Sequence, residues 1–508
     1  MNPRWYTRAR WVVQILALAA YLAAFILARR GTGLPAAANV FLRLDPLAAL
    51  AQALSGREFV AGMLLSLLVI GLTLGLGRAW CGWLCPLGTI LDVFRPSRRR
   101  VRALAAAEPW RRVKILLVVL ILASALLGGL SLMVLDPLTL LTRSLASSIW
   151  PALDRIVLAL ETGLYRVPLL APLVGRADSF LRPAVFPTEP LPGRVALGFG
   201  VLLASIIGLN WLAERFWCRY MCPLGGLLAL LSRVAFVKRT VAPGCNACGA
   251  CTHVCPTATI RADRQFASDP AECTMCLECL PACPRQGAMF SAGTAIAPRM
   301  AYDPKRREVL AALGGGLAGA ALLRSQTATP SASAHWVQPP GARENNLIGK
   351  CLRCGECTRT CPTGAIHPAI SEAGLEGLWT PVLVPRLGYC DYSCTACGEI
   401  CPVGAIPALA LEQKRLTVIG VAYIDKDRCI AWADLRDCIV CEEMCPVAEK
   451  AILLERVEVT RHDGSTVSVQ QPRVVRERCI GCGICEYKCP LSGEAAIRVW
   501  APNIALPL

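Results

Sequence analysis

The number and spacing of the cysteines constrain this chain more than any other feature. Its 508 residues include 28 cysteines. Six runs ending in Cys-x3-Cys-Pro hold four cysteines each, and two further Cys-x3-Cys-Pro-Leu-Gly motifs hold the rest. Because no cysteine is left over and none is placed like a disulfide partner, the pattern indicates iron–sulfur clusters.

The first two runs, "CNACGACTHVCP" and "CTMCLECLPACP", have the Cys-x2-Cys-x2-Cys-x3-Cys-Pro spacing of bacterial ferredoxins. In that spacing, three thiolates surround one [4Fe–4S] cube and the fourth cysteine ligates the partner cluster. Zinc sites pair two Cys-x2-Cys elements instead of repeating this run, so zinc is the weaker interpretation. The predicted ligands are Cys245, Cys248, Cys251 and Cys283 for one cluster, and Cys273, Cys276, Cys279 and Cys255 for the other.

Four more runs lie between residues 350 and 500. The first and last are regular, whereas the middle two are stretched, with a Cys-x3-Cys opening in one and Cys429 standing apart in the other. We expect the first and last runs to pair, and the two middle runs to pair. This predicts clusters from Cys351, Cys354, Cys357 and Cys489; from Cys479, Cys482, Cys485 and Cys361; from Cys390, Cys394, Cys397 and Cys445; and from Cys429, Cys438, Cys441 and Cys401.

Apolar segments at about 11–28, 59–77, 114–135 and 195–213 are long enough to cross a bilayer. Hydrophobic residues make up 55% of the chain, and the net charge of +17 comes largely from arginines beside these segments. We therefore attribute the charge to membrane flanks and expect no nucleic-acid partner. Nine Lys or Arg residues follow the second segment and six follow the third, which predicts a cytoplasmic second-to-third loop and N-terminus.

The two remaining cysteine motifs, "WCGWLCPLG" and "WCRYMCPLG", follow the second and fourth apolar segments. Both are therefore expected at the cytoplasmic membrane face, as a two-fold repeat of helix pairs. In a continuing helix, residues four apart share a face, so four thiols could meet and hold a metal or a cluster. The alternative is two packing motifs with buried thiols. The candidate ligands are Cys81, Cys85, Cys218 and Cys222.

A fifth apolar segment, Val309–Leu323, follows the twin arginines Arg306–Arg307. Its length suits a signal h-region, and the twin arginines are typical of export of a folded, cluster-bearing module. Ala332–Ser333–Ala334 matches a cleavage site, but we favour a flexible linker without cleavage. A short interfacial helix, with everything after it cytoplasmic, is the alternative to a crossing.

The predicted fold is a multi-domain membrane protein with a four-helix transmembrane bundle and two α+β bacterial-ferredoxin-like modules. The expected domains are residues 1–235 (membrane domain), 236–300 (two-cluster module), 301–349 (twin-Arg segment and linker) and 350–508 (four-cluster module).

These motifs resemble two families joined in one chain. Residues 1 to about 300 resemble the NapH/MauN membrane proteins in their spans, Cys-x3-Cys motifs and two-cluster tail. Residues from about 305 resemble the NapG/MauM family in the twin arginines, "QPPGAREN", "LWTPVLVPRLGYCDYSC" and the four-run pattern. The resemblance implies a quinol-linked electron path from the bacterial inner membrane to the periplasm, with Tat export of the second half. Fusion of the two is a departure from these families.

Six [4Fe–4S] clusters and a membrane thiolate site predict an electron-transfer subunit, not an enzyme. Its donor would be the quinol pool or a cytoplasmic protein, and its acceptor an extracytoplasmic redox enzyme or cytochrome. The first module would be cytoplasmic and the second periplasmic. None of the four histidines lies in an expected span, so no haem is expected within the bilayer. A maturation factor for a periplasmic metalloenzyme is the rival hypothesis.

Overall fold

The computed structural model describes residues 4–27, 39–95, 108–184, 196–293, 302–325, 335–343, 345–461 and 464–502. The basic residues after position 95 and the tripeptide Ala332–Ser333–Ala334, on which parts of the sequence interpretation depend, lie outside these ranges. The chain divides into two compact units. The first comprises Met1–Leu27, Ala36–Ser144 and Leu197–Leu322, and the second comprises Ala28–Pro35, Leu145–Ala196 and Leu323–Leu508.

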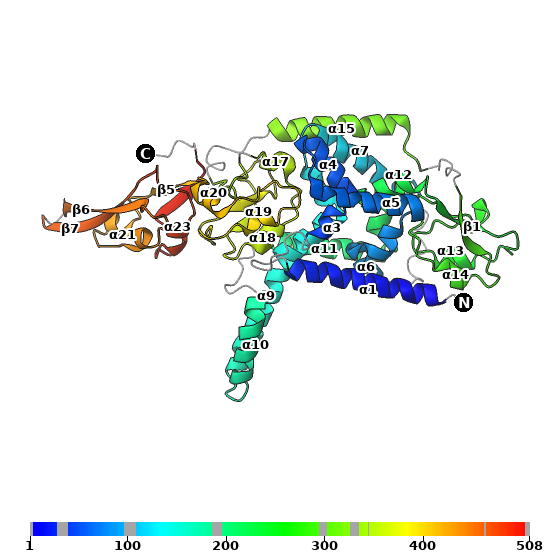
Figure 1. Ribbon diagram of the computed structural model, residues 1–508, viewed down its shortest axis with the longest axis horizontal. Helices are drawn as coiled ribbons and strands as arrows, with labels where there is room; N and C mark the ends of the chain where they lie inside the picture. The colour runs from blue at the N-terminus through cyan, green and yellow to red at the C-terminus, as the bar shows by residue number, and fades with distance from the viewer. Residues whose placement is uncertain are drawn as a thin grey trace. The chain divides into compact units, whose positions relative to one another are not determined.

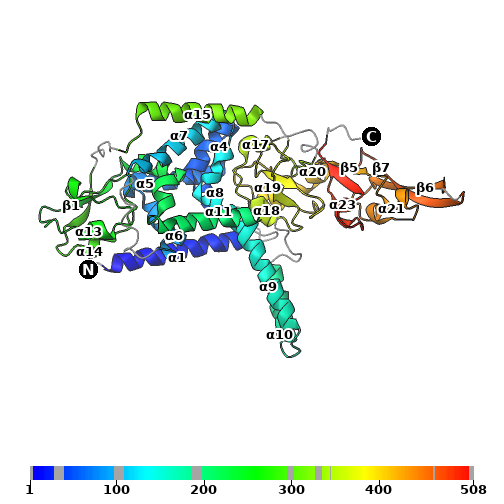
Figure 2. The ribbon, with the colours of Figure 1, turned by 180° about the vertical axis from the view of Figure 1, so that it is seen from behind.

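The first unit is a bundle of apolar helices that packs against a small two-stranded sheet (Figures 1 and 2). Within the bundle, α7 lies against α4 and α12, and α1 lies against α6. Short 3-10 and π turns interrupt several of the helices. The helices are α1 (Arg4–Leu27), α3 (Val40–Arg43), α4 (Pro46–Gly56), α5 (Ser66–Leu76), α6 (Pro86–Val93), α7 (Val113–Leu126), α8 (Pro137–Ser144), α11 (Ala196–Gly208), α12 (Pro223–Ser232), α13 (Ala250–Val254), α14 (Cys279–Ala282) and α15 (Arg306–Ser325).

Among the described residues, two helices are long and apolar enough to cross a bilayer, Trp5–Leu27 and Arg306–Ser325. The other predicted spans coincide with shorter apolar helices. A 3-10 turn at Ala61–Leu65 precedes the 11-residue α5, and α7 has 14 residues. At 1.5 Å rise per residue, helices of this length alone do not cover about 30 Å of hydrocarbon. The four-span bundle therefore stays a prediction.

Helices α4 and α8 begin with the same sequence, Leu-Asp-Pro-Leu, a second internal repeat beside the cysteine motifs. The Asp45 carboxylate accepts hydrogen bonds from the amides of Leu47 and Ala48, and Asp136 caps α8 in the same way. The two carboxyl groups are buried and lie close enough to influence each other electrostatically. Burial raises the pKa of both carboxyls, and the neighbouring Asp45 raises that of Asp136 further.

Helix α15 runs parallel to α7 in both views (Figures 1 and 2). Glu308, near its start, forms an ion pair at 2.7 Å with Arg112, just before α7. Further along, Gly316 lies so close to the backbone of Leu120 that a side chain there would collide with it, at 2.6 Å from the carbonyl oxygen. Ala320 is buried near Gly129, past the end of α7. Small residues four apart thus allow the two helices to approach closely.

The first ferredoxin-like module closes the end of the helical bundle. Its two strands, β1 (Val237–Val241) and β2 (Ala288–Ala292), pair antiparallel with Val237 opposite Ala292. The two cysteine runs lie between these strands, and each ends on a one-turn helix, α13 or α14. The backbone amide of Phe236 bonds to the Leu74 carbonyl at 2.8 Å, so the sheet begins directly at α5.

The second unit contains a helical pair, α9 and α10, and a chain of small sheets and one-turn helices. The three sheets are antiparallel pairs: β3 with β4, β5 with β8, and the hairpin β6–β7. Its elements are α9 (Trp150–Tyr165), α10 (Ala171–Ala184), α17 (Leu347–Lys350), α18 (Glu356–Thr360), β3 (Ile366–Pro368), β4 (Pro381–Leu383), α19 (Ala396–Glu399), α20 (Leu411–Leu416), β5 (Val421–Ile424), α21 (Ile430–Ala433), α22 (Val440–Glu443), β6 (Ile452–Thr460), β7 (Thr466–Val474), α23 (Ile484–Lys488) and β8 (Ile497–Trp500).

Candidate metal centres

The four regular cysteine runs share one backbone shape. In each run, two residues have positive φ angles: the second residue between the first two cysteines, and the residue directly after the second cysteine. Three of the runs place residues other than glycine at one or both positions, such as Met275 (52°) and Leu277 (61°). Side chains rarely adopt this region because it is sterically strained. The strain is consistent with a loop that must bend its three thiols toward one point.

In the first module, the fourth cysteine of each run lies beside the other run. Burial raises the pKa of the Cys251 thiol, and the nearby Cys283 and Cys245 thiols raise it further. Burial likewise raises the pKa of Cys273 to about 12, with a contribution from Cys255. These neighbours agree with the prediction that the fourth cysteine of each run ligates the cluster of the other run. Ligation itself stays a prediction.

In the second unit, the pairing of runs differs from the sequence prediction. Burial raises the pKa of the Cys357 thiol, and the nearby thiols of Cys354, Cys351 and Cys401 add to the effect. In the next run, Cys397 is similarly affected by burial and then by Cys390 and Cys361. The first run of this unit is therefore paired with the second, not with the last.

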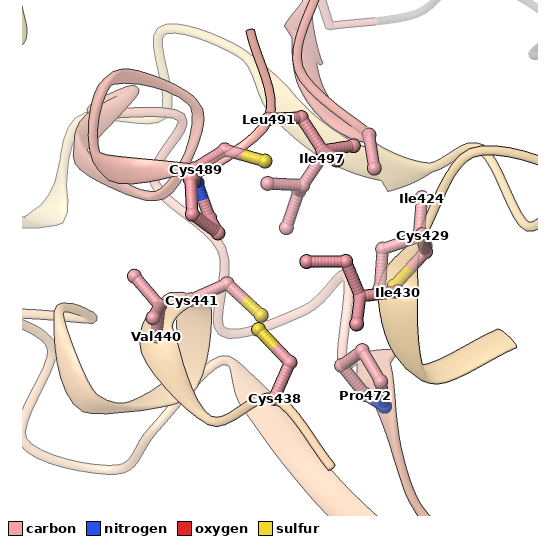
Figure 3. A pocket seen from close by; sticks show the side chains of 12 residues that line it. Ile424, Cys429, Ile430, Cys438, Val440, Cys441, Pro472, Cys489, Leu491 and Ile497 are labelled. Atoms are coloured by element: carbon pink, nitrogen blue, oxygen red, sulfur yellow. The ribbon is translucent and has the colours of Figure 1, made fainter. Parts of the chain in front are cut away.

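The last two runs pair in the same way. One pocket is lined by Cys429, Cys438, Cys441 and Cys489, and Figure 3 shows the sulfurs of Cys438 and Cys441 close together with the Cys489 sulfur pointing into the same space. A second pocket is lined by Cys445, Cys479, Cys482 and Cys485. The prediction that Cys489 joins the first run and Cys445 the second is therefore wrong in this geometry.

The physical reason is local packing. The one-turn helix α18 contacts α19, and α22 contacts α23, so each pair of consecutive runs forms one compact two-run body. A proline after each fourth cysteine ends its helix and turns the chain toward the neighbouring run. Run order in the sequence therefore decides the partners, and the stretched spacing of the middle runs does not.

The two Cys-x3-Cys-Pro-Leu-Gly motifs form π-helical turns, Trp80–Leu84 and Trp217–Met221. The Cys85 amide donates to the Trp80 carbonyl at 2.9 Å and the Cys222 amide to the Trp217 carbonyl at 2.8 Å. The expectation of a continuing α-helix is therefore wrong. Each π turn ends just before the second cysteine of its motif, and the proline after that cysteine begins a new helix. All four thiols are buried.

Two arginines that the sequence interpretation missed connect the motifs. Arg78 lies three residues before Cys81, and Arg215 lies three residues before Cys218. Arg78 reaches the Cys81 sulfur at 4.0 Å and donates to the Cys218 carbonyl at 3.4 Å. Arg215 donates to the Cys81 carbonyl at 3.0 Å. The repeated Arg-x-Trp-Cys spacing was the available signal for these residues.

Buried ion pairs join this site to the first module. Glu272, immediately before Cys273, pairs with Lys114 at 2.6 Å and with Arg111 at 3.3 Å. Burial alone would raise the pKa of Glu272. The positive charges of Lys114, Arg111 and Arg78 nevertheless hold this pKa below its ordinary value. The indole of Trp83 donates to the Met275 carbonyl at 2.8 Å. The second cysteine run of the module thus lies directly on the first Cys-x3-Cys motif.

The donor set fits iron–sulfur chemistry. Every predicted ligand is a thiol, a soft donor that favours iron–sulfur clusters, zinc or copper(I). Within the described ranges, no three His, Cys, Asp or Glu side chains converge closely enough to hold a single metal ion. The thiols instead surround spaces such as the two pockets of the last runs.

Comparison with known proteins agrees with this chemistry. The family model described as a 4Fe-4S binding domain matches residues 59–103 and 195–241, which contain the two Cys-x3-Cys-Pro-Leu-Gly motifs. The protein therefore contains 4Fe-4S ferredoxin-type domains. No solved structure is significantly similar to the chain.

Three curated relatives define the family more closely. The methylamine utilization ferredoxin-type protein MauM of Methylorubrum extorquens is 35% identical over 40% of this chain and 92% of its own length. The ferredoxin-type protein NapG of Escherichia coli is 34% identical, over 39% of this chain and 85% of its own. The chain belongs to this MauM/NapG family of ferredoxin-type proteins. The ferredoxin-type protein NapH of Escherichia coli is 26% identical over 47% of this chain and 71% of its own.

Proposed function

We propose that this protein is a membrane-anchored iron–sulfur electron carrier in which a NapH/MauN-like part precedes a NapG/MauM-like part. Its family membership and the similarity to NapH support the two parts. The parts are a membrane domain at residues 1–235, a two-cluster module at 236–300, a linking segment at 301–349 and a four-cluster module at 350–508. The chain would carry electrons and catalyse no reaction by itself.

The proposed cofactors are six [4Fe–4S] clusters and one further centre held by Cys81, Cys85, Cys218 and Cys222. In the second unit, the neighbouring thiols support four ligand sets. These are Cys351, Cys354, Cys357 and Cys401; Cys390, Cys394, Cys397 and Cys361; Cys479, Cys482, Cys485 and Cys445; and Cys429, Cys438, Cys441 and Cys489.

The observation that carries the proposal is the continuity of these sets. The Cys390 amide donates to the Cys482 carbonyl at 2.8 Å, so the second and fourth runs of the unit touch. The Cys485 thiol is in turn within electrostatic range of Cys441. Electrons would therefore pass from the Cys351 set to the Cys390 set, then to the Cys479 set and finally to the Cys429 set. Contiguous one-electron centres of this kind serve transfer between partners.

The direction of α15 supports the proposed topology. Because α15 runs parallel to α7, its twin arginines lie at the end of α7 where Arg111 contacts the first module. The chain after α15 would then leave at the opposite end of the bundle. We therefore place the first module on the cytoplasmic side and the four-cluster module on the extracytoplasmic side, with α15 as a fifth span.

Quinol, or a cytoplasmic protein, would be the donor, and an extracytoplasmic oxidoreductase or cytochrome the acceptor. Anaerobically purified protein should become reduced when a quinol analogue is added, as seen in its visible and EPR spectra. Clusters that stay oxidised with quinol but are reduced by a low-potential cytoplasmic donor would remove quinol from the proposal. Reporter fusions after residues 300 and 502 should report opposite sides of the membrane. Fusions on the same side would contradict the topology.

A further inference from the structure

The arginines of the two motifs form a reciprocal pair. Each arginine precedes the first cysteine of its own motif and donates a hydrogen bond to the carbonyl of the first cysteine in the other motif. Both side chains are 1% exposed. Two buried guanidinium groups are thus fixed between the motifs, whose four buried thiols lie within electrostatic range of one another, and each joins the two halves of the repeat.

The surrounding ion pairs do not neutralise these cations. The network of described ion pairs linked to the motifs contains six cations and four carboxylates, of which seven side chains are buried and three are 11–18% exposed. A surplus of buried positive charge is strongly unfavourable unless an anion is close by. A thiolate-ligated iron–sulfur centre is such an anion. The members are Arg10, Arg78, Arg95, Arg111, Lys114 and Arg215, with Asp92, Glu214, Glu272 and Glu278.

The two arginines differ in what holds them. Arg215 forms a two-point ion pair with Asp92, at 2.8 and 2.6 Å, within the helical bundle. Arg78 instead donates to the Ala271 carbonyl at 3.0 Å and pairs with Glu272 at 3.5 Å, both in the first module. Gly82, between the cysteines of the first motif, lies against the Thr274 carbonyl with no room for a side chain. The pseudo-symmetric site therefore has one side that contacts the next cluster.

We propose that Arg78 and Arg215 are positioning residues that compensate the charge of the centre held by Cys81, Cys85, Cys218 and Cys222 and raise its reduction potential. Arg78 additionally keeps this centre in contact with the cluster of Cys273, Cys276, Cys279 and Cys255. This inference rests on the proposed function, because it requires a cluster at the four membrane-face thiols. Reduction adds one negative charge to the centre, so a fixed cation nearby favours the reduced form.

The test is an EPR-monitored redox titration of the full-length, anaerobically purified protein. The signal of the centre is the one that disappears, together with part of the iron, in the double variant Cys81→Ala/Cys218→Ala. Arg78→Gln and Arg215→Gln should each shift its reduction equilibrium about tenfold toward the oxidised form, which is about 59 mV for one electron. In Arg78→Lys and Arg215→Lys the reduction potential should stay close to that of the unmodified protein, because lysine keeps the positive charge.

Arg233→Gln is the matched control, since Arg233 pairs with Asp303 in the same unit and should leave the potential unchanged. Only Arg78→Gln should also slow electron exchange with the Cys273 cluster, by about tenfold in freeze-quench experiments. Unchanged potentials in both glutamine variants, with the signal present, would overturn the inference and leave the proposed function intact. If the cysteine double variant loses neither signal nor iron, the proposed centre itself is wrong. Either glutamine variant decides the question if the other does not fold.

Discussion

Ion pairs are buried at the junction of helices and module in the first unit, whereas those on the β6–β7 hairpin of the second unit are exposed. Lys114 and Glu272 are at most 1% exposed, but Arg473 and Glu455 are 70% and 51% exposed. Both units contain regular Cys-x2-Cys-x2-Cys-x3-Cys-Pro runs, although the two middle runs of the second unit are stretched. The difference indicates that buried charge pairs fix the first module to its helices, whereas the hairpin of the second unit does not depend on such pairs.

The largest effect should come from removing cluster ligands, and it tests whether the runs of the second unit pair as those of the first do. Cys354→Ser should cost one cluster, roughly four iron atoms. Adding Cys401→Ser to it should cost little more iron, because both cysteines belong to one set. Adding Cys489→Ser should remove a second cluster. Iron and sulfide analysis measures this, and the opposite result would restore the pairing of the first run with the last.

The next effect concerns the buried pairs of the first unit. Glu272→Gln leaves Lys114, Arg111 and Arg78 without their shared carboxylate, and uncompensated buried charge of this kind costs about 3–5 kcal/mol. We expect a lower midpoint in thermal unfolding of the detergent-solubilised protein, with the first module affected most. A midpoint within experimental error of the unmodified protein would mean that the junction does not depend on charge.

A smaller effect depends on pH. Burial and then the neighbouring Glu272 raise the pKa of Asp269 to about 6, from an ordinary value of 3.8. Folding favours the protonated form of Asp269. Its contribution to the free energy of unfolding is therefore fully present below about pH 4 and is lost as the pH rises through 6. Asp269→Asn keeps the neutral side chain at all pH values. We expect it to raise stability by about 1–3 kcal/mol at pH 8 and to change little at pH 4.

Thermal unfolding of both proteins across this pH range measures the difference. A variant that is less stable at pH 8 would show that the ionised carboxylate is needed at this position.

The smallest effect should be on the hairpin of the second unit. Glu455→Gln removes one partner of the exposed pair with Arg473, and exposed pairs contribute about 0–1 kcal/mol. The unfolding midpoint and the cluster spectra should both stay the same. A loss as large as that of Glu272→Gln would remove the contrast between the two units.

Much of this organisation could be predicted from the sequence, because cysteine spacing is a local constraint. The Cys-Pro ending of each run predicts that the fourth cysteines of the first module are exchanged. The two runs lie between β1 and β2 in the chain, and Figure 1 shows their helices α13 and α14 beside β1. The pairing in the second unit could not be read from spacing, because it depends on which one-turn helices pack together. Spacing also could not show the π turns, which depend on backbone bonds one residue longer than in an α-helix.

The sequence analysis also did not identify the charged residues of the site. Arg78 and Arg215 stand at equal positions in the repeat, but an arginine near an apolar segment is ordinarily a membrane flank. Only the three-dimensional contacts with Cys218 and Cys81 distinguish the two roles. The Leu-Asp-Pro-Leu repeat at Asp45 and Asp136 is a similar case. Helix capping explains each copy by itself, and only the structure shows that the two buried carboxyl groups are neighbours.

The exchange of fourth cysteines has a consequence for biosynthesis. In the proposed ligand sets, Cys361 completes the set of the following run and Cys401 completes the set of the preceding one. A nascent chain that has left the ribosome only as far as the first run can finish neither site. If these sets hold the clusters, the two sites of a pair would become complete together, and a stop codon within either run would leave both sites incomplete.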